Sequence, residues 1–231
     1  MPEILISGKY PTIDESGHIV SPNDPHKLPT DESPSECCPF HTDHAIDQLK
    51  RRNLARDQGR EVYSVTREDE SMREALKQFR AVRDDYRTAD YGKSFNWAEI
   101  ATEYKRQLSN FDHLPSRETE DVPIDWFAVA FRSKRRTDCD NVDLFDADRK
   151  AYEEAFYGTN KSLLMYWYSD LDDEQNCLAT CIWTSRDIAR SVNSLPHHHE
   201  AARLSAGSYV HYNVGRCRIQ WVDDTFRVSS W

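Results

Sequence analysis

Three consecutive histidines, His197, His198 and His199, are the residues of this sequence best suited to chemistry, and they follow a proline in "PHHHEAA". An imidazole titrates near neutral pH, so it suits both acid–base catalysis and metal binding. Neighbouring residues on a helix point about 100° apart, and no second histidine stands four positions on from any of the three. His211 would lie about 21 Å from His197 along a helix. The spacing therefore predicts no helical metal site.

Acid–base chemistry is the remaining role for the histidines. His197 and Glu200 are spaced to pair, or to form a solvated first turn of a helix. At least one of His198 and His199 is expected to face the neighbouring sheet, either as a general acid–base or as a structural side chain hydrogen-bonded to a loop carbonyl. The predicted partners in catalysis are Arg132, at the end of an apolar strand, and the hydroxyl of Tyr209.

Aromatic side chains in the strands near these residues form the candidate substrate-binding set. Large strand aromatics fill cores more often than they bind ligands, so core packing is the competing interpretation. The set is Tyr166, Trp167, Tyr168, Trp183 and Tyr212.

The elements that position these residues form two patterns along the chain. Residues 1–45 are rich in Pro, Ser, Asp and Glu, which predicts a disordered arm. Residues 46–110 predict a helical extension with helices over 67–90 and 95–108. In the first helix Thr66 and Asp69 form a capping pattern. Its apolar stripe is Met72, Leu76, Phe79 and Val82.

Residues 111–231 alternate between strands and helices. The second and third strands are joined by a short turn, which predicts a hairpin. The order is β-α-β-β-α-β, so we predict an α+β domain of the ferredoxin-like class. The expected strands are 125–133, 162–169, 177–184 and 212–222, with a short fifth strand in "TFRVSSW", and the expected helices are 143–156, one beginning at "RDIARSV", and 197–211.

Strand alternation predicts a sheet that is apolar on both faces. Trp126, Ala128 and Ala130 share one face of the first strand, and Phe127 and Val129 lie on the other. Helices of this topology cover one face only. The second face must then be covered by the N-terminal helices, by a second subunit or by a ligand.

Composition limits the partners and the compartment. The chain has 231 residues and a net charge of −10, which argues against nucleic acid and anionic membranes as partners. No apolar run approaches the roughly 20 residues of a membrane helix, and no secretory signal is recognisable. The six cysteines form no CxxC pair, which favours a reducing, cytoplasmic location. Cys37 and Cys38, near His41 and His44, are the one cluster with metal-like spacing, and it lies in the Pro-rich arm.

Several blocks resemble a family of uncharacterised fungal proteins. They are "SFNWAEI" before the first strand, "NCLATCIWTSRDIA", and "PHH" running to two tyrosines and a basic strand. The resemblance covers residues 94–231. In that family Asn is followed directly by Leu, whereas here Cys177 stands between them. The resemblance implies a fungal protein with a domain like the dimeric α+β barrels, and it implies no reaction.

Three functions remain open from the sequence. The first is a small-molecule enzyme of fungal metabolism, for example secondary metabolism, that works by proton transfer as an isomerase, cyclase or lyase. It would need neither metal nor nucleotide cofactor, because no Gly-rich phosphate loop and no zinc motif is present. The second is a haem-binding oxidative enzyme with an axial histidine. The third is a non-catalytic dimerisation module. We expect a homodimer in each case.

Overall fold

The computed structural model describes residues 12–13, 19–20, 65–117, 123–138 and 141–231. The chain divides into two compact units, Gly8–Arg60 and a larger unit that contains Glu61–Trp231. In the smaller unit the two-residue strands β1 (Thr12–Ile13) and β2 (Ile19–Val20) pair in antiparallel fashion. Most of the predicted arm, with Cys37 and Cys38, lies outside the described residues.

The larger unit is built on an antiparallel sheet with the strand order β4-β5-β3-β6-β7. Its first four strands and their helices follow the order β-α-β-β-α-β, so the fold is ferredoxin-like α+β, as predicted. β7 extends the sheet beyond β6 through a turn in which Asp223 and Asp224 both have positive φ. The strands are β3 (Asp125–Arg135), β4 (Leu163–Tyr168), β5 (Asn176–Trp183), β6 (Tyr209–Val222) and β7 (Thr225–Ser230).

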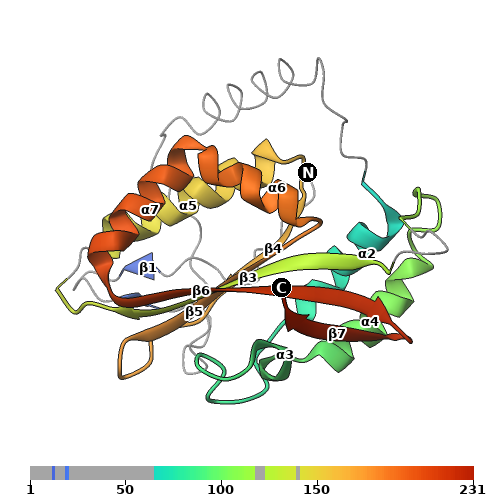
Figure 1. The fold of residues 1–231 in the computed structure, drawn as a ribbon, viewed down its shortest axis with the longest axis horizontal. Helices are drawn as coiled ribbons and strands as arrows, with labels where there is room; N and C mark the ends of the chain where they lie inside the picture. Colours follow the sequence, from blue (N-terminus) through green and yellow to red (C-terminus); the bar gives the residue numbers. More distant parts are fainter. Residues whose placement is uncertain (1–11, 14–18, 21–64, 118–122, 139–140) are drawn as a thin grey trace, which may run out of the picture. The chain divides into compact units, whose positions relative to one another are not determined.

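One face of the sheet, which we call the helix-side face, carries Phe127, Val129 and Phe131 and is covered by the helices that follow β3 and β5 (Figure 1). α5 packs on it through Ala155 and Phe156, and α6 through Ala189. The helices are α5 (Asn141–Gly158), α6 (Arg186–Ser191) and α7 (Pro196–Ser208), with a 3₁₀ turn, η2 (Val192–Ser194), between the last two.

The opposite face, which we call the extension-side face, carries Trp126, Ala128 and Ala130 and is covered by the N-terminal helices of the same chain (Figure 1). The aromatic ring of Tyr104 packs edge-on against Trp126 with 5.5 Å between ring centroids. The sequence left three possibilities for covering this face: the N-terminal helices, a second subunit or a ligand. In the structure the N-terminal helices cover it. They are α2 (Arg67–Ala75), the 3₁₀ turn η1 (Leu76–Gln78), α3 (Tyr91–Ser94) and α4 (Trp97–Leu108).

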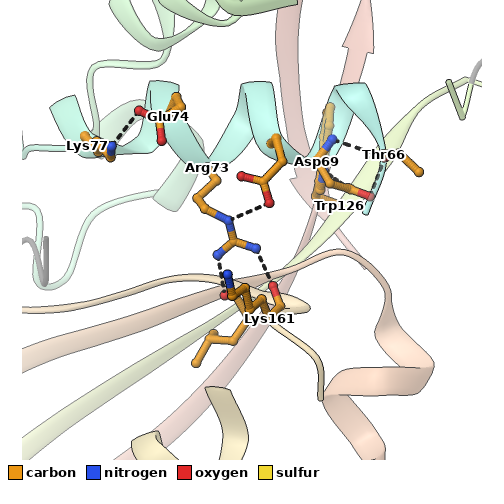
Figure 2. Close-up of polar contacts among 9 residues, drawn as sticks. Thr66, Asp69, Arg73, Glu74, Lys77, Trp126 and Lys161 are labelled. Atoms are coloured by element: carbon orange, nitrogen blue, oxygen red, sulfur yellow. Dashed lines mark hydrogen bonds and ion pairs between the residues drawn. The ribbon is translucent and has the colours of Figure 1, made fainter. Parts of the chain in front are cut away.

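Polar contacts hold α2 on the sheet, as Figure 2 shows. The Thr66 side chain caps α2 by accepting from the Asp69 amide, as the sequence predicts. The Asp69 carboxylate accepts from the indole N–H of Trp126 at 2.9 Å and from Arg117 at 2.7 Å. Arg73 donates to the carbonyls of Lys161 and Leu163, at the start of β4. These bonds join the extension to two strands of the sheet.

The helix predicted over 67–90 is wrong after residue 78. Phe79 adopts an extended backbone, and its ring stacks on Phe95 with 4.2 Å between centroids. Asn96 fixes this break, because its side chain accepts from the Arg80 amide and donates to the Gln78 carbonyl. Val82, predicted to lie in the apolar stripe, is therefore 50% exposed.

The helix predicted over 197–211 ends three residues early. Residues 209–211 belong instead to β6, where Tyr209 and His211 pair with Arg135 and Lys134 of β3. The strand therefore starts earlier than the hydrophobic pattern indicates, and Tyr209 is a strand residue.

Candidate functional site

The structure does not bring the four predicted catalytic side chains together. Arg132 lies on the extension-side face, where its guanidinium donates to the carbonyls of Arg87 and Ala89 at 3.0 and 2.8 Å. It thereby fastens the loop after η1 to the sheet. His198 and His199 lie on α7, above the opposite face, so Arg132 shares no site with them.

The histidines start helix α7 rather than line the sheet. His197 and His199 are exposed, and Glu200 pairs with Arg203 instead of His197. His198 is half-buried, with its Nδ1 3.7 Å from the carboxylate of Glu154 on α5. Burial lowers the pKa of His198, and the nearby Glu154 carboxylate opposes that shift. His198 thus lies between α7 and α5, where burial and the Glu154 carboxylate act on it in opposite directions.

Glu154 has the larger role at this helix start. It is buried, and one of its oxygens accepts from the backbone amides of His197 and His198 at 3.0 and 3.3 Å. Leu195 stands at the cap position and offers no side-chain acceptor. A carboxylate from α5 therefore caps α7 and complements the positive end of its dipole.

The candidate substrate-binding residues divide between the two faces. Trp167 lies on the extension-side face, where it packs edge-on against Phe79 and Phe95. Trp183 is buried in the helix-side core, and its indole N–H points at the sulfur of Cys181. Both rings fill cores. Tyr166, Tyr168 and Tyr212 lie on the helix-side face, with Tyr209.

These tyrosines surround a carboxyl group that the sequence reasoning missed, Asp148 of α5. The Tyr166 hydroxyl donates to both oxygens of Asp148, at 2.8 and 2.9 Å. Tyr168 follows on the same face, with 6.1 Å between its ring centroid and that of Tyr166. We call Asp148, Tyr166, Tyr168, Arg135 and Tyr209 the Asp148 cluster.

Arg135 supplies the positive charge of the Asp148 cluster. It is the last residue of β3, is buried, and its guanidinium lies over the Phe145 ring at 4.8 Å. Its charge lowers the pKa of Asp148, and its charge and hydrogen bond lower that of Tyr209. In both residues burial outweighs Arg135, so both pKa values end above their ordinary range.

The electrostatics single out Asp148. Burial raises its pKa from 3.8 to about 6, against the hydrogen bond from Tyr166 and the charge of Arg135. Asp148, Tyr166 and Tyr168 are nevertheless residues of intermediate exposure. A carboxyl group with a pKa near the working pH is suited to take up a proton and return it.

A row of aromatic rings extends from the Asp148 cluster in both directions. On one side Tyr152 stacks on Tyr166 with 5.8 Å between centroids, and burial raises its pKa to about 12. On the other side Tyr209 stacks on Tyr212 at 5.2 Å, and Tyr212 stacks on Phe131 at 6.2 Å. Phenol groups and ring faces therefore frame one carboxyl group and one guanidinium.

One signal in the sequence could have pointed to Asp148. The apolar stripe of its helix is Leu144, Ala147, Ala151 and Ala155, all of them buried. Asp148 stands four residues after Leu144 and three before Ala151, on that same stripe. A single carboxyl group within an apolar stripe is a candidate functional group, because its burial has a cost.

No group of three or more His, Cys, Asp or Glu side chains within the described residues is arranged to hold a metal ion. The haem alternative needs an axial histidine within the sheet–helix layer. The histidines of "PHHH" lie instead on the surface or against Glu154.

The fold and this cluster define an α+β protein of ferredoxin-like topology with a tyrosine-framed carboxyl group between helix and sheet. Residues 54–230 match the profile of the PB2B2.08-like family, and the chain belongs to that family. A relative in Schizosaccharomyces pombe, UPF0643 protein PB2B2.08, is 28% identical over 148 residues, which are 60% of this chain. The match spans 62% of that relative's length.

Solved structures resemble this chain at the level of its topology only. A candidate antibiotic biosynthesis monooxygenase from Nitrosomonas europaea is 11% identical, with a TM-score of 0.36 over 46% of this chain and 99% of its own. A dimeric ferredoxin-like protein of unknown function from Bacteroides fragilis is 12% identical, with a TM-score of 0.30 over 39% and 93%. At these scores the likenesses carry no information about activity.

Proposed function

We propose that this chain is a small-molecule enzyme that works by proton transfer, with Asp148 as its acid–base group. The observation that carries the proposal is the Tyr166 hydroxyl, which donates to both oxygens of Asp148, at a carboxyl group whose pKa burial raises to about 6. The sequence assigned the acid–base role to His198 and His199. The contacts of Asp148 suit that role better than an exposed His199 or a His198 held against Glu154.

The other members of the Asp148 cluster have complementary roles. The Tyr166 hydroxyl orients the carboxylate and uses only part of its acceptor capacity, which leaves lone pairs for a substrate. Arg135 and Tyr209 carry the oxyanion-stabilising role that we predicted from the sequence for Arg132 and Tyr209. Tyr168 and Tyr212 offer ring faces to the substrate.

The substrate class follows from these surroundings. Aromatic rings with few charges suit an apolar, oxygenated metabolite that has an acidic C–H next to a carbonyl. Asp148 takes the proton from carbon, and the C–H electron pair moves to the carbonyl oxygen as an enolate beside Arg135. Where a C=C bond adjoins that carbon, the enolate extends over it, and return of the proton from Asp148 to the far carbon of that bond gives the conjugated isomer. The step balances without metal, nucleotide or oxidant.

Free thiols support a reducing compartment such as the cytoplasm for this activity. Within the described residues, Cys177, Cys181 and Cys217 form no disulfide. None of the described helices combines the length and apolar character needed to span a bilayer.

The proposal is tested by incubating the full chain in D₂O with a metabolite extract from Schizosaccharomyces pombe. Mass spectrometry should reveal a metabolite that gains deuterium or converts to an isomer in the presence of the protein. We expect Asp148→Asn to slow that reaction by at least about 100-fold, the usual contribution of a general acid–base. The rate with the unaltered chain should rise with pH through about 6, as Asp148 ionises.

The matched control is Asp146→Asn, two residues earlier on α5, where the carboxylate pairs with Arg149 and Lys150. It should leave the reaction unchanged. Equal turnover by the Asp148→Asn variant, or no metabolite that depends on the protein, would refute the proposed function.

A further inference from the structure

The helices leave part of the helix-side face uncovered. The core on this face takes its strand residues from β3, β4 and β5, and it holds no described side chain of β6 or β7. Tyr212 is 46% exposed, and Val214, Val129 and Phe131 are half-buried. Tyr212 and Val214 lie on the same side of β6, and Val214 pairs with Phe131 of β3. These four side chains, which we call the apolar strip, are therefore open to solvent.

The same face of the sheet becomes basic further along β6. Arg216 and Arg218 follow Val214 at alternate positions, so their side chains lie on the same side of the strand, about 7 Å apart. Arg227 of β7 lies on that side too, because its partner on β6, Gln220, stands two residues beyond Arg218. The exposed side of β6 therefore changes from apolar to basic after Val214.

The indole ring of Trp231 holds two guanidinium groups at this place. The guanidinium carbon of Arg218 lies 4.2 Å from the ring centroid, and that of Arg186, at the start of α6, lies 5.3 Å from it. The ring is itself fixed by Phe127, with 5.1 Å between centroids. A guanidinium that stacks on a ring keeps its N–H donors for other partners. The contact thus orders two arginines before any ligand binds. We call Arg186, Arg216, Arg218 and Arg227 the arginine face.

Most of the arginine face has no acceptor within the described part of the chain. Arginines that form neither an ion pair nor a side-chain hydrogen bond there are Arg186, Arg190, Arg216 and Arg227. Three of these four belong to the arginine face, and Arg190 follows Arg186 by one helical turn. Arg218 pairs with Asp125 at 3.3 Å. Unpartnered cations gathered in one place are unexpected in a chain with 40 Asp and Glu against 30 Lys and Arg. They repel one another, so a bound anion would stabilise the folded chain.

Charge and size together define the anion that fits the arginine face. A phosphate monoester carries close to two negative charges and three acceptor oxygens, which match several guanidinium groups better than one carboxylate does. The chain as a whole has a net charge of −10, so a long polyanion would be repelled wherever it extends beyond the face. A compact anion avoids that repulsion. The apolar strip beside the arginines suits an apolar body attached to the phosphate.

We propose that this chain binds a phosphate monoester of an apolar alcohol, with the phosphate on the arginine face and the apolar body along Val214 and Tyr212. The ring of Tyr212 stacks on that of Tyr209 at 5.2 Å, so the apolar end of the bound molecule lies beside the Asp148 cluster. The binding does not depend on the proposed function, because the arginine face takes no part in the proton transfer and binding is measured without turnover.

Isothermal titration calorimetry of the full chain with octyl phosphate, at concentrations too low for micelles, tests the proposal. Octyl phosphate should bind at least about tenfold more tightly than methyl phosphate or octanol, because each of these supplies only one part of the contacts. Arg216→Gln combined with Arg227→Gln should weaken the binding of octyl phosphate at least about tenfold. The matched control is Arg80→Gln combined with Arg106→Gln. It removes the same charge from exposed ion pairs of the extension and should leave the affinity unchanged.

Three further probes distinguish this ligand from other anions: a short polyglutamate peptide, a single-stranded oligonucleotide, and vesicles that contain phosphatidic acid. Each should bind more weakly than octyl phosphate. Tighter binding of any of the three, no binding of octyl phosphate, equal affinity for methyl and octyl phosphate, or equal weakening by the two double variants would each overturn the proposal.

Discussion

Ionised Asp148 lowers the stability of the folded chain, because burial disfavours its charged form. Its pKa is raised from 3.8 unfolded to about 6 folded, so the folded chain holds this proton more tightly. Below about pH 4 both states are protonated and there is no penalty. Between about pH 4 and 6 the unfolded chain ionises first, so stability falls as pH rises. Above pH 6 the full cost, at most about 3 kcal/mol, remains.

Asp148→Asn should therefore stabilise the protein at pH 8 while it slows the proposed reaction. We expect an increase of about 1 to 3 kcal/mol in the free energy of unfolding at pH 8, and little change at pH 4. Urea denaturation at the two pH values measures the difference. A natural protein that keeps so unfavourable a carboxyl group gains something other than stability from it.

Asp146→Asn should act in the opposite direction. Hydrogen bonds from Lys150, followed by those from Arg149, hold the pKa of Asp146 below its usual range. That carboxylate contributes stability above its unfolded pKa and loses it as pH falls. The asparagine variant should be slightly less stable at pH 8, by less than about 1 kcal/mol for so exposed a pair. The same sign for both variants would contradict the assignment of burial as the cause at Asp148.

Sequence reasoning at the residue scale succeeds where a property repeats and fails where it depends on one contact. The alternation of Trp126 and Phe127 between faces follows from the strand period, and burial confirms it. The same period places Arg132 on the extension-side face. Its separation from the histidines also depends on α7 lying above the opposite face, which the strand period does not predict. Nothing local to Glu154 shows that it caps a helix 43 residues later.

At the scale of elements, the N-terminus of helix α7 is capped by Glu154 of the neighbouring helix α5. Glu154→Gln removes the charge from the acceptor of the His197 and His198 amides. We expect a loss of about 1 to 2 kcal/mol in the free energy of unfolding. The pKa of His198, which burial already lowers, should fall further, because the Glu154 carboxylate is what raises it.

NMR titration of the histidine ring protons measures the pKa change. Glu200→Gln is the control, since Glu200 pairs with exposed Arg203 and leaves both amides in place. A His198 pKa that is unchanged by Glu154→Gln would show that the 3.7 Å contact in the structure is not formed in solution.

Element boundaries were predictable where the stop and start signals are local. Ser185 caps α6 by accepting from the Ile188 amide, and Pro196 opens α7; a serine just before a helix and a proline in its first turn are local start signals. The end of the helix after residue 78 was not predictable from its periodicity. Phe79 leaves the helix to join an aromatic group that comes from three separate segments.

At the scale of the whole molecule, a sheet that is apolar on both faces needs two layers of helices. Helices α5 and α6 cover one face, and the N-terminal helices cover the other (Figure 1). The apolar pattern of the strands predicts that the second face of the sheet is buried. It does not predict which element buries that face, because any apolar surface could do so. The observed cover joins residues 66–108 and the strands into one core.

A chain that begins at residue 111 should therefore fail as an independent domain. Without α2 and α4 it would expose side chains that are at present fully buried, and a patch of that size drives aggregation. Gel filtration and binding of an apolar dye should show aggregates or a loosely packed state. The side chains exposed would be Trp126, Ala128, Leu178, Ile182 and Ile219.

A chain that begins at residue 61 is the matched comparison, because it removes Met1–Ser7 and the smaller unit, Gly8–Arg60, and keeps both layers of helices. It should remain folded, with a single cooperative urea transition. If the chain from 111 were equally cooperative and did not bind the dye, the extension would be an accessory to an already complete domain. Since Asp69 bonds the Trp126 indole and Arg73 bonds the start of β4, we expect the extension and the sheet to unfold as one unit.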